Sequence, residues 1–174
     1  MKKLVIFTDI GDTIIDEGTE VYGGLRGIVT AADCIPGAKE TFLKLYEEGY
    51  PIVMVADGRV QSFHNTMEQN GLDHIFSAWI ISQEVGEGKP SPLMFQAAMD
   101  AMGLKEEDKR RVIMVGNNLK RDILGANLFG IASVLIDWAP RRSMIPECEE
   151  EKPAYIIHTP EELLPLAEKL EAEM

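Results

Sequence analysis

Short apolar runs recur along this chain, and segments with helical periodicity lie between them. Runs of this length that are rich in β-branched residues are typical of strands buried on both faces of a parallel sheet. Strands that alternate with helices predict an α/β fold, a doubly wound, Rossmann-like parallel sheet of five to six strands with right-handed crossovers and flanking helices. The expected strands are residues 4–7, 52–55, 78–81, 112–115 and 131–136, with 155–157 as a short edge strand.

The expected helices carry recognisable end signals. Ser91 and Pro92 are typical N-cap and first-turn residues, so we expect a helix to begin there. Residues 60–70 are expected to form another helix, which Gly71 ends. Thr159 has the N-cap position of a capping box, which predicts the start of the last helix.

Length and composition restrict the classes of partner. The chain has 174 residues, so we expect a single domain over residues 1–174. The net charge of −12 argues against nucleic acid or an anionic membrane as a partner, because both bind basic surfaces. Cys34 and Cys148 have no CxxC context, which favours free thiols in a reducing cytoplasm. No apolar stretch approaches membrane-spanning length, and Asp9 interrupts the first apolar run too early for a signal peptide.

Residues 16–35 interrupt the alternation of strands and helices. Four glycines, Gly18, Gly23, Gly24 and Gly27, are interleaved with apolar residues in this segment. The pattern is too rich in glycine for a helix, and it fits either a short β-hairpin or a flap. We therefore expect a small flap insertion over residues 16–35.

Polar residues lie at or near the ends of four predicted strands. Open parallel sheets bind ligands at the carboxyl ends of their strands, so we expect these residues to converge. A lone Asp or Lys in a loop is usually structural, but four such stations in order favour a functional site. The stations are Asp9 to Thr13, Ala56 to Gly58, Lys89 in a Gly-Lys-Pro loop, and Asn117 with Asp122.

The order and spacing of these stations resemble the haloacid dehalogenase-like (HAD) superfamily, whose members are mostly aspartate-nucleophile phosphohydrolases. The resemblance implies that Asp9 attacks phosphorus to form an aspartyl-phosphate, and that Lys89 pairs with Asp9 and the phosphoryl group. It also implies Mg²⁺ as the cofactor, held by oxygen ligands, and a small phosphorylated substrate. The implied metal ligands are Asp9, the Gly11 carbonyl, Asn117 and Asp122, and the implied substrate-binding residues are Thr13, Asp57, Gly58, Arg59 and Lys89.

Three departures from the family motifs affect the expected activity. The family's first motif is Asp-x-Asp-x-Thr, whose second Asp protonates the leaving group and then activates water, but Gly11 stands at that position. Loss of a positioned acid costs about 10²–10⁴-fold in rate, and alkyl phosphates are affected most. Asp12 is the candidate catalytic replacement, because glycine gives the backbone freedom to re-aim it. Ala56 and Asn117 replace a hydroxyl and a carboxylate, so we expect weaker binding of phosphate and metal.

The leading hypothesis is a Mg²⁺-dependent phosphohydrolase of a small phosphorylated metabolite or an activated acyl or aryl phosphate. The intervals between the stations are too short for the family's cap domain, so we expect an open site, which a homo-oligomer would help to cover. One alternative is a non-catalytic binding or interaction protein that keeps the fold. The other is a metal-independent haloacid dehalogenase, which is disfavoured because a small halide substrate needs a closed, dry pocket.

Overall fold

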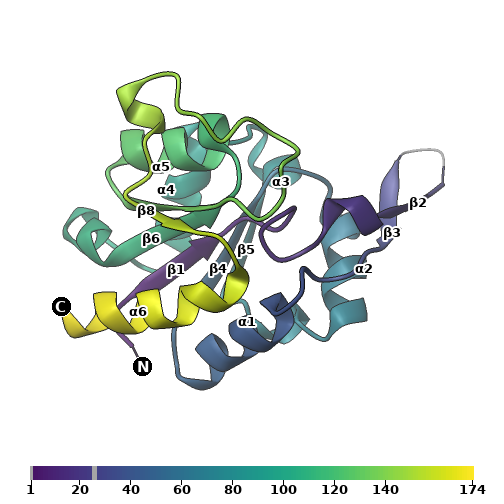
Figure 1. Cartoon of the computed structure of the whole chain (residues 1–174), viewed down its shortest axis with the longest axis horizontal. Coiled ribbons are helices and arrows are strands. Elements are labelled where there is room, and N and C mark those ends of the chain that lie inside the picture. Colours follow the sequence, from purple (N-terminus) through teal and green to yellow (C-terminus); the bar gives the residue numbers. More distant parts are fainter. Residues whose placement is uncertain (1, 25–26) are drawn as a thin grey trace.

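The computed structural model describes residues 2–24 and 27–174. Six parallel strands form its central sheet, in the order β5–β4–β1–β6–β7–β8 (Figure 1). The predicted doubly wound sheet is confirmed, and it includes the short edge strand. The strands are β1 (Val5–Thr8), β4 (Ile52–Ala56), β5 (Ala78–Ile81), β6 (Val112–Gly116), β7 (Ala132–Ile136) and β8 (Tyr155–Ile157).

The strand order reverses at β1. The chain adds β4 and β5 on one side of β1, and then adds β6, β7 and β8 on the other side. The register of β1 and β6 pairs Val5 with Val112 and Thr8 with Val115. The two strands therefore end side by side, at the kind of switch point where open α/β sheets bind ligands.

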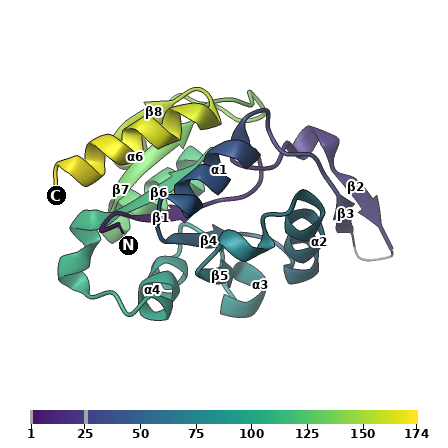
Figure 2. The same ribbon diagram turned by 90° about the horizontal axis from the view of Figure 1, so that it is seen from below.

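Helices cover both faces of the sheet (Figure 2). Leu4 and Ile6 belong to one buried core, whereas Val5 and Phe7 belong to the other, as alternation along a doubly buried strand requires. The first core also contains side chains of α1, α2 and α6, and the second contains side chains of α4 and α5. These helices are α1 (Ala38–Glu47), α2 (Val60–Asn70), α4 (Pro92–Ala101), α5 (Leu124–Phe129) and α6 (Leu163–Ala172).

Most helix ends agree with the sequence signals. Helix α2 has the predicted bounds, and Gly71 follows it in the left-handed conformation. The Ser91 hydroxyl accepts a hydrogen bond from the N–H of Leu93, as expected of an N-cap. The hydroxyl of Thr159 makes no such bond, and a 3₁₀ turn, η6 (Pro160–Glu162), leads into α6. Several short elements were not predicted, among them α3 (Ser82–Val85), and neither was the π-helical geometry of the turn η4 (Leu119–Ile123) before α5.

The described part of the glycine-rich segment contains two antiparallel strands, as the hairpin alternative expects. Residues 25 and 26 lie outside the described residues, and the flap insertion over residues 16–35 stays a prediction. A 3₁₀ turn, η1 (Glu17–Thr19), precedes the antiparallel strands β2 (Val21–Gly23) and β3 (Ile28–Ala31). The hairpin extends beyond the sheet next to α2 (Figure 2). Within the described residues, no separate domain is inserted between the strands of the sheet.

Both cysteines are free thiols, as predicted. Burial raises the pKa of the Cys34 thiol to about 11, whereas Cys148 is exposed. In the described part of the chain, no helix has the length and apolar character needed to cross a membrane.

Candidate active site

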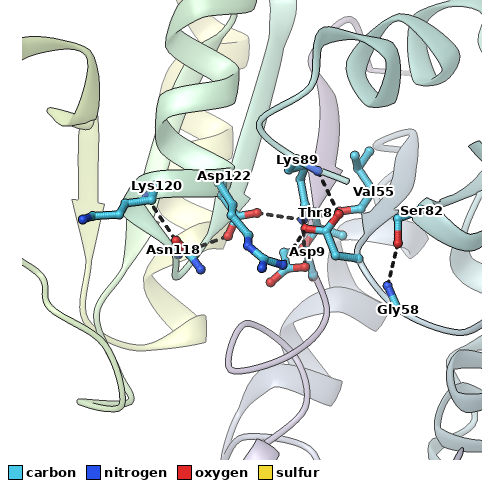
Figure 3. A network of polar contacts seen from close by, with 11 residues as sticks. Thr8, Asp9, Val55, Gly58, Ser82, Lys89, Asn118, Lys120 and Asp122 are labelled. Atoms are coloured by element: carbon cyan, nitrogen blue, oxygen red, sulfur yellow. Dashed lines mark hydrogen bonds and ion pairs between the residues drawn. The ribbon is translucent and has the colours of Figure 1, made fainter. Parts of the chain in front are cut away.

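Asp9 and Lys89 form the centre of a polar cluster at the switch point (Figure 3). Asp9 follows β1, and its backbone N–H donates to the carbonyl of Val115 in β6, at 2.9 Å. Lys89 reaches Asp9 from the loop before α4, and its Nζ donates to Oδ1 of Asp9, at 2.9 Å. The Lys89 side chain is only 1% exposed. The expected contact between these two stations is therefore present.

The Lys89 ammonium has three oxygen atoms within 3 Å. Besides Asp9, Nζ donates to the carbonyl of Val55 at 2.6 Å and lies 2.7 Å from Oδ1 of Asp122. Oδ2 of Asp57 lies 3.9 Å away. Burial lowers the pKa of Lys89, but the carboxylates of Asp122, Asp9 and Asp57 outweigh burial and raise it above its usual value. Lys89 is therefore charged at neutral pH.

Asp122 enters the cluster from the π-helical turn η4. Its Oδ2 accepts a hydrogen bond from the N–H of Asn118, at 3.1 Å. A Cβ on Gly116 would overlap the Asp122 carboxylate, so a glycine at the end of β6 makes this approach possible. Burial raises the pKa of Asp122, the charge of Asp9 raises it further, and Lys89 opposes both effects. The carboxylate is therefore held in a region that is already negatively charged.

In the second station, residues 56–58, the Asp57 carboxylate contacts Lys89. Oδ1 of Asp57 accepts a hydrogen bond from the backbone N–H of Lys89, at 2.8 Å, and Oδ2 lies 3.6 Å from Nη1 of Arg121. The N–H of Gly58 donates to the hydroxyl of Ser82 at 2.9 Å, so this N–H already has a protein partner. Arg59 precedes α2 and lines the cavity described next.

One cavity of about 310 Å³ opens over this cluster. Residues of the β2–β3 hairpin, of α2 and of the loops after β1, β4 and β6 contribute to its lining. A concave site of this size suits a small molecule. The lining includes the predicted residues Asp9, Gly11, Asp57, Gly58, Arg59, Lys89, Asn117 and Asp122, and further charged residues Glu17, Glu20, Arg121 and Arg142.

Two predicted site residues, Asp12 and Thr13, are buried and are not among the residues that line this cavity. Oδ1 of Asp12 accepts a hydrogen bond from the N–H of Glu17, at 3.1 Å, and Oδ2 lies 3.5 Å from Nε of Arg141. Asp12 has a φ of 50°, a left-handed conformation that non-glycine residues adopt rarely and Asp more readily than most. The structure therefore does not bring Asp12 to the place of the missing acid.

Glu17 occupies the space beside Gly11. A Cβ built on Gly11 would lie 3.0 Å from Cδ of Glu17 and would overlap its Oε1. Burial raises the pKa of Glu17, the charge of Asp12 raises it further, and Arg142 lowers it. Sequence reasoning missed Glu17 because it lies in the glycine-rich segment, away from any strand end.

Other lining residues were also missed, among them Asn118, Arg121 and Arg142. Asn118 and Arg121 are sequence neighbours of Asn117 and Asp122, so attention to both flanks of the fourth station would have found them. Arg142 lies in the segment after β7 that reads as a solvated, proline-rich loop. No periodicity or spacing in the sequence marks it.

The oxygen atoms around Asp9 suit a hard cation. Three carboxylates, Asp9, Asp57 and Asp122, surround one ammonium, and the exposed Arg121 pairs with Asp57, so carboxylates outnumber cations in the cluster. Asn117 is buried, and its Nδ2 has no hydrogen-bond partner among the described residues, so the protein does not fix this amide. Over the described ranges, no group of three or more His, Cys, Asp or Glu is arranged to hold a metal. A cation here would therefore combine two carboxylates with neutral oxygens from Asn117 and Gly11.

Comparison with known sequences agrees with this arrangement. A family model described as haloacid dehalogenase-like hydrolase matches residues 2–130. Glyceraldehyde 3-phosphate phosphatase of Methanopyrus kandleri is 31% identical over 135 residues, which are 78% of this chain and 57% of that protein. Phosphoserine phosphatase of Thermus thermophilus is 33% identical over 118 residues, which are 68% of this chain and 45% of that protein. The matches thus span about half the length of these curated relatives.

Comparison with solved structures supports the fold. The putative HAD-hydrolase YfnB of Bacillus subtilis, solved bound to magnesium, has a TM-score of 0.67 and 22% identity to this chain. The superposition covers 78% of this chain and 56% of that chain. At this level of identity, the likeness concerns the fold alone.

Proposed function

The chain belongs to the haloacid dehalogenase-like hydrolases, and from this we propose that it is a phosphohydrolase of a small phosphorylated metabolite or an activated acyl or aryl phosphate. One observation carries the proposal: Asp9 lies at the end of β1 with Oδ1 2.9 Å from the buried ammonium of Lys89, inside the cavity. Phosphoryl transfer depends on positioning and on cations placed where charge develops. The phosphatases among the relatives support the same class of reaction.

Asp9 is the proposed nucleophile. Its carboxylate attacks phosphorus, the bond to the leaving group breaks, and water then hydrolyses the aspartyl-phosphate. Lys89 holds Oδ1 of Asp9, so the ammonium orients the carboxylate and stands next to the phosphoryl group. Arg59 lines the cavity from the start of α2 and is the proposed contact for the substrate anion. Asp57 and Gly58 act indirectly, because their polar groups are bound to Lys89 and Ser82.

We also propose that Mg²⁺ binds beside Asp9. Its ligands would be the Asp9 carboxylate, the Gly11 carbonyl, the Asn117 amide oxygen and Asp122. A bound cation supplies the charge that lets an anionic nucleophile meet an anionic substrate. The excess of carboxylates over ammonium groups in the cluster supports this assignment.

Turnover of p-nitrophenyl phosphate and acetyl phosphate tests the proposal. Wild type, Asp9→Asn and a control, Asp73→Asn, are compared in Mg²⁺ and in chelator. Asp73 is exposed, in the 3₁₀ turn η2 (Asp73–Ile75) that follows α2 in the chain. We expect Asp9→Asn to lose on the order of 10⁴-fold or more in kcat, because the nucleophile is removed. The control should keep the wild-type rate, and chelator should abolish it.

Other results would favour the alternatives. Equal turnover by wild type and Asp9→Asn would contradict the nucleophile assignment. A wild type that hydrolyses no phosphate, but binds phosphorylated ligands in the cavity, would favour a binding protein that keeps the fold. Halide release from haloacids in the presence of chelator would favour the dehalogenase.

A further inference from the structure

The proposed phosphohydrolase lacks an acid at the usual position, and the inference below rests on that proposed function. An alkyl phosphate needs a proton for its leaving group, and Gly11 has no side chain to supply one. The space that a side chain at residue 11 would enter is instead filled by the Glu17 carboxylate, which a Cβ on Gly11 would overlap. We infer that Glu17 is the general acid and base of this site, in place of a carboxylate at position 11.

The backbone around Glu17 is fixed by charged side chains. Oδ1 of Asp12 accepts the N–H of Glu17 at 3.1 Å, and Asp16 caps the first turn of η1. Arg141 contacts both carboxylates, with its Nε 3.5 Å from Oδ2 of Asp12 and its Nη2 bound to Oδ1 of Asp16. These contacts hold the start of η1, and the Glu17 side chain extends back over Gly11. Asp12 is therefore a positioning residue for Glu17.

Glu17 is also a carboxylate of the cavity whose oxygens are not engaged by the described residues. Asp57 and Asp122 line the same cavity, but hydrogen bonds and ion pairs with Lys89 and backbone N–H groups engage their oxygens. Glu20 accepts a hydrogen bond from the Tyr22 hydroxyl. Among the contacts of the described residues, the Glu17 carboxylate has neither a hydrogen bond nor an ion pair, and it lines the cavity with Asp9. It is therefore placed to exchange protons with substrate and water.

The two chemical steps balance with Glu17 in this role. In the first, an oxygen of Asp9 bonds to phosphorus, the bond from phosphorus to the leaving-group oxygen breaks, and Glu17 gives that oxygen its proton. In the second, the Glu17 carboxylate takes a proton from water, the water oxygen bonds to phosphorus, and the bond to Asp9 breaks. Inorganic phosphate leaves, and Glu17 is protonated again for the next cycle.

The leaving group distinguishes this role from a structural one. Glycerol 2-phosphate has an alkyl leaving group that needs a proton, whereas the p-nitrophenolate of p-nitrophenyl phosphate leaves without one. We expect Glu17→Gln to lower kcat for glycerol 2-phosphate by about 10²–10⁴-fold. With p-nitrophenyl phosphate, the same variant should release a rapid burst of one p-nitrophenolate per enzyme and then turn over slowly. The burst arises because formation of the aspartyl-phosphate is spared and its hydrolysis is slowed.

A variant that moves the carboxylate from residue 17 to residue 11 tests whether the two side chains would occupy the same space. In Gly11→Asp alone, the new side chain meets the Glu17 carboxylate, which must move aside, so the single variant does not separate the two carboxylates. The double variant Gly11→Asp with Glu17→Ala removes the overlap. Its kcat for glycerol 2-phosphate should be at least ten-fold higher than that of Glu17→Ala alone. Glu40→Gln, an exposed change on α1, is the matched control and should behave as wild type. Circular dichroism of each variant checks that the fold is kept.

The outcomes separate this inference from the proposed function. An active wild type with a Glu17→Gln variant that keeps glycerol 2-phosphate turnover within about three-fold would overturn the role of Glu17 and leave the phosphohydrolase standing. A uniform loss on both substrates without a burst would also overturn it, because a structural defect predicts that pattern. A wild type that hydrolyses neither ester would overturn both.

Discussion

One buried ammonium organises the charged residues of this site. Nζ of Lys89 contacts Asp9, Asp122 and the Val55 carbonyl. The backbone N–H of Lys89 donates to Asp57. When one partner of a buried charge cluster is removed, the remaining charges stay buried without compensation. Lys89 therefore contributes to the stability of the fold as well as to the charge of the site.

Lys89→Met should destabilise the protein by about 3–5 kcal/mol at pH 7. The folded-state pKa of Lys89 is raised, so its contribution is fully present below its unfolded pKa and is lost only at strongly alkaline pH. Without Lys89, the pKa of Asp122, which burial already raises, should rise further. Protonation of Asp122 then relieves the charge as the pH falls, so the deficit relative to wild type should shrink at pH 5.

Urea unfolding at pH 7 and pH 5 measures this difference. Lys44→Met is the matched control, because Lys44 is exposed and its one ion pair among the described residues is with Glu48, one helical turn away. Its free energy of unfolding should change by no more than about 0.5 kcal/mol. A Lys89→Met variant as stable as wild type at pH 7 would show that the ammonium is not needed to hold the carboxylates.

At the scale of residues, the polar residues at strand ends could be predicted, but the turn that brings Glu17 back to Gly11 could not. Asp9, Asn117 and Lys89 could be chosen because they follow apolar runs or lie in a loop with a distinctive composition. Glu17 reaches Gly11 only because η1 turns the chain back, and no periodicity in the sequence encodes that turn. Asp12 was the natural candidate by position, but its left-handed backbone directs its carboxylate to the N–H of Glu17.

At the scale of elements, the β2–β3 hairpin is attached to α2 by side chains that bind its backbone. Nδ2 of Asn65 donates to the carbonyl of Val29 at 2.9 Å, and the N–H of Val29 donates to the hydroxyl of Ser62 at 3.0 Å. Gln69 accepts the N–H of Ala32 in the same way. Tyr22 and Val29 of the hairpin line the cavity, so the position of the hairpin affects the shape of the substrate site.

Asn65→Ala should loosen the hairpin without unfolding the sheet. The variant loses a hydrogen bond to a backbone carbonyl, at a cost of about 1 kcal/mol. We expect faster amide hydrogen exchange over residues 21–23 and 28–31 and a higher KM, with kcat within about two-fold of wild type. Glu68→Ala, an exposed change on the same helix, is the control. Unchanged exchange in Asn65→Ala would mean that other contacts hold the hairpin.

The elements themselves were largely predictable, because the buried strands and the α2 and α4 ends carry strong local signals. The π-helical geometry of the segment before α5 was not predictable. Its first turn is π-helical, and there the Asp122 carboxylate accepts the N–H of Asn118 and contacts Lys89. The tertiary contacts of Asp122 thus accompany a π-helical turn, which helix propensity does not predict. Glycine at residue 116 was needed as well, because the carboxylate packs against the end of β6.

At the scale of the whole molecule, an acidic chain gathers three carboxylates at the switch point of its sheet. The net charge is −12, and three carboxylates share one ammonium in the site. Repulsion among such charges opposes folding, and a bound cation relieves it. Cation binding should therefore be visible as stability, independently of any catalysis.

Mg²⁺ should raise the melting temperature of the wild type. A ligand that binds only the folded state at 100 times its Kd adds about 2.7 kcal/mol, which for a chain of this size corresponds to an increase of roughly 5–10 °C. Asp122→Asn removes one like charge from the cluster, so its melting temperature without Mg²⁺ should equal or exceed that of wild type, while its response to Mg²⁺ should fall by more than half. Asp100→Asn, an exposed change on α4, should respond as wild type does. Differential scanning calorimetry across a Mg²⁺ titration measures both quantities, and a wild-type melting temperature that Mg²⁺ leaves unchanged would contradict a cation site among these carboxylates.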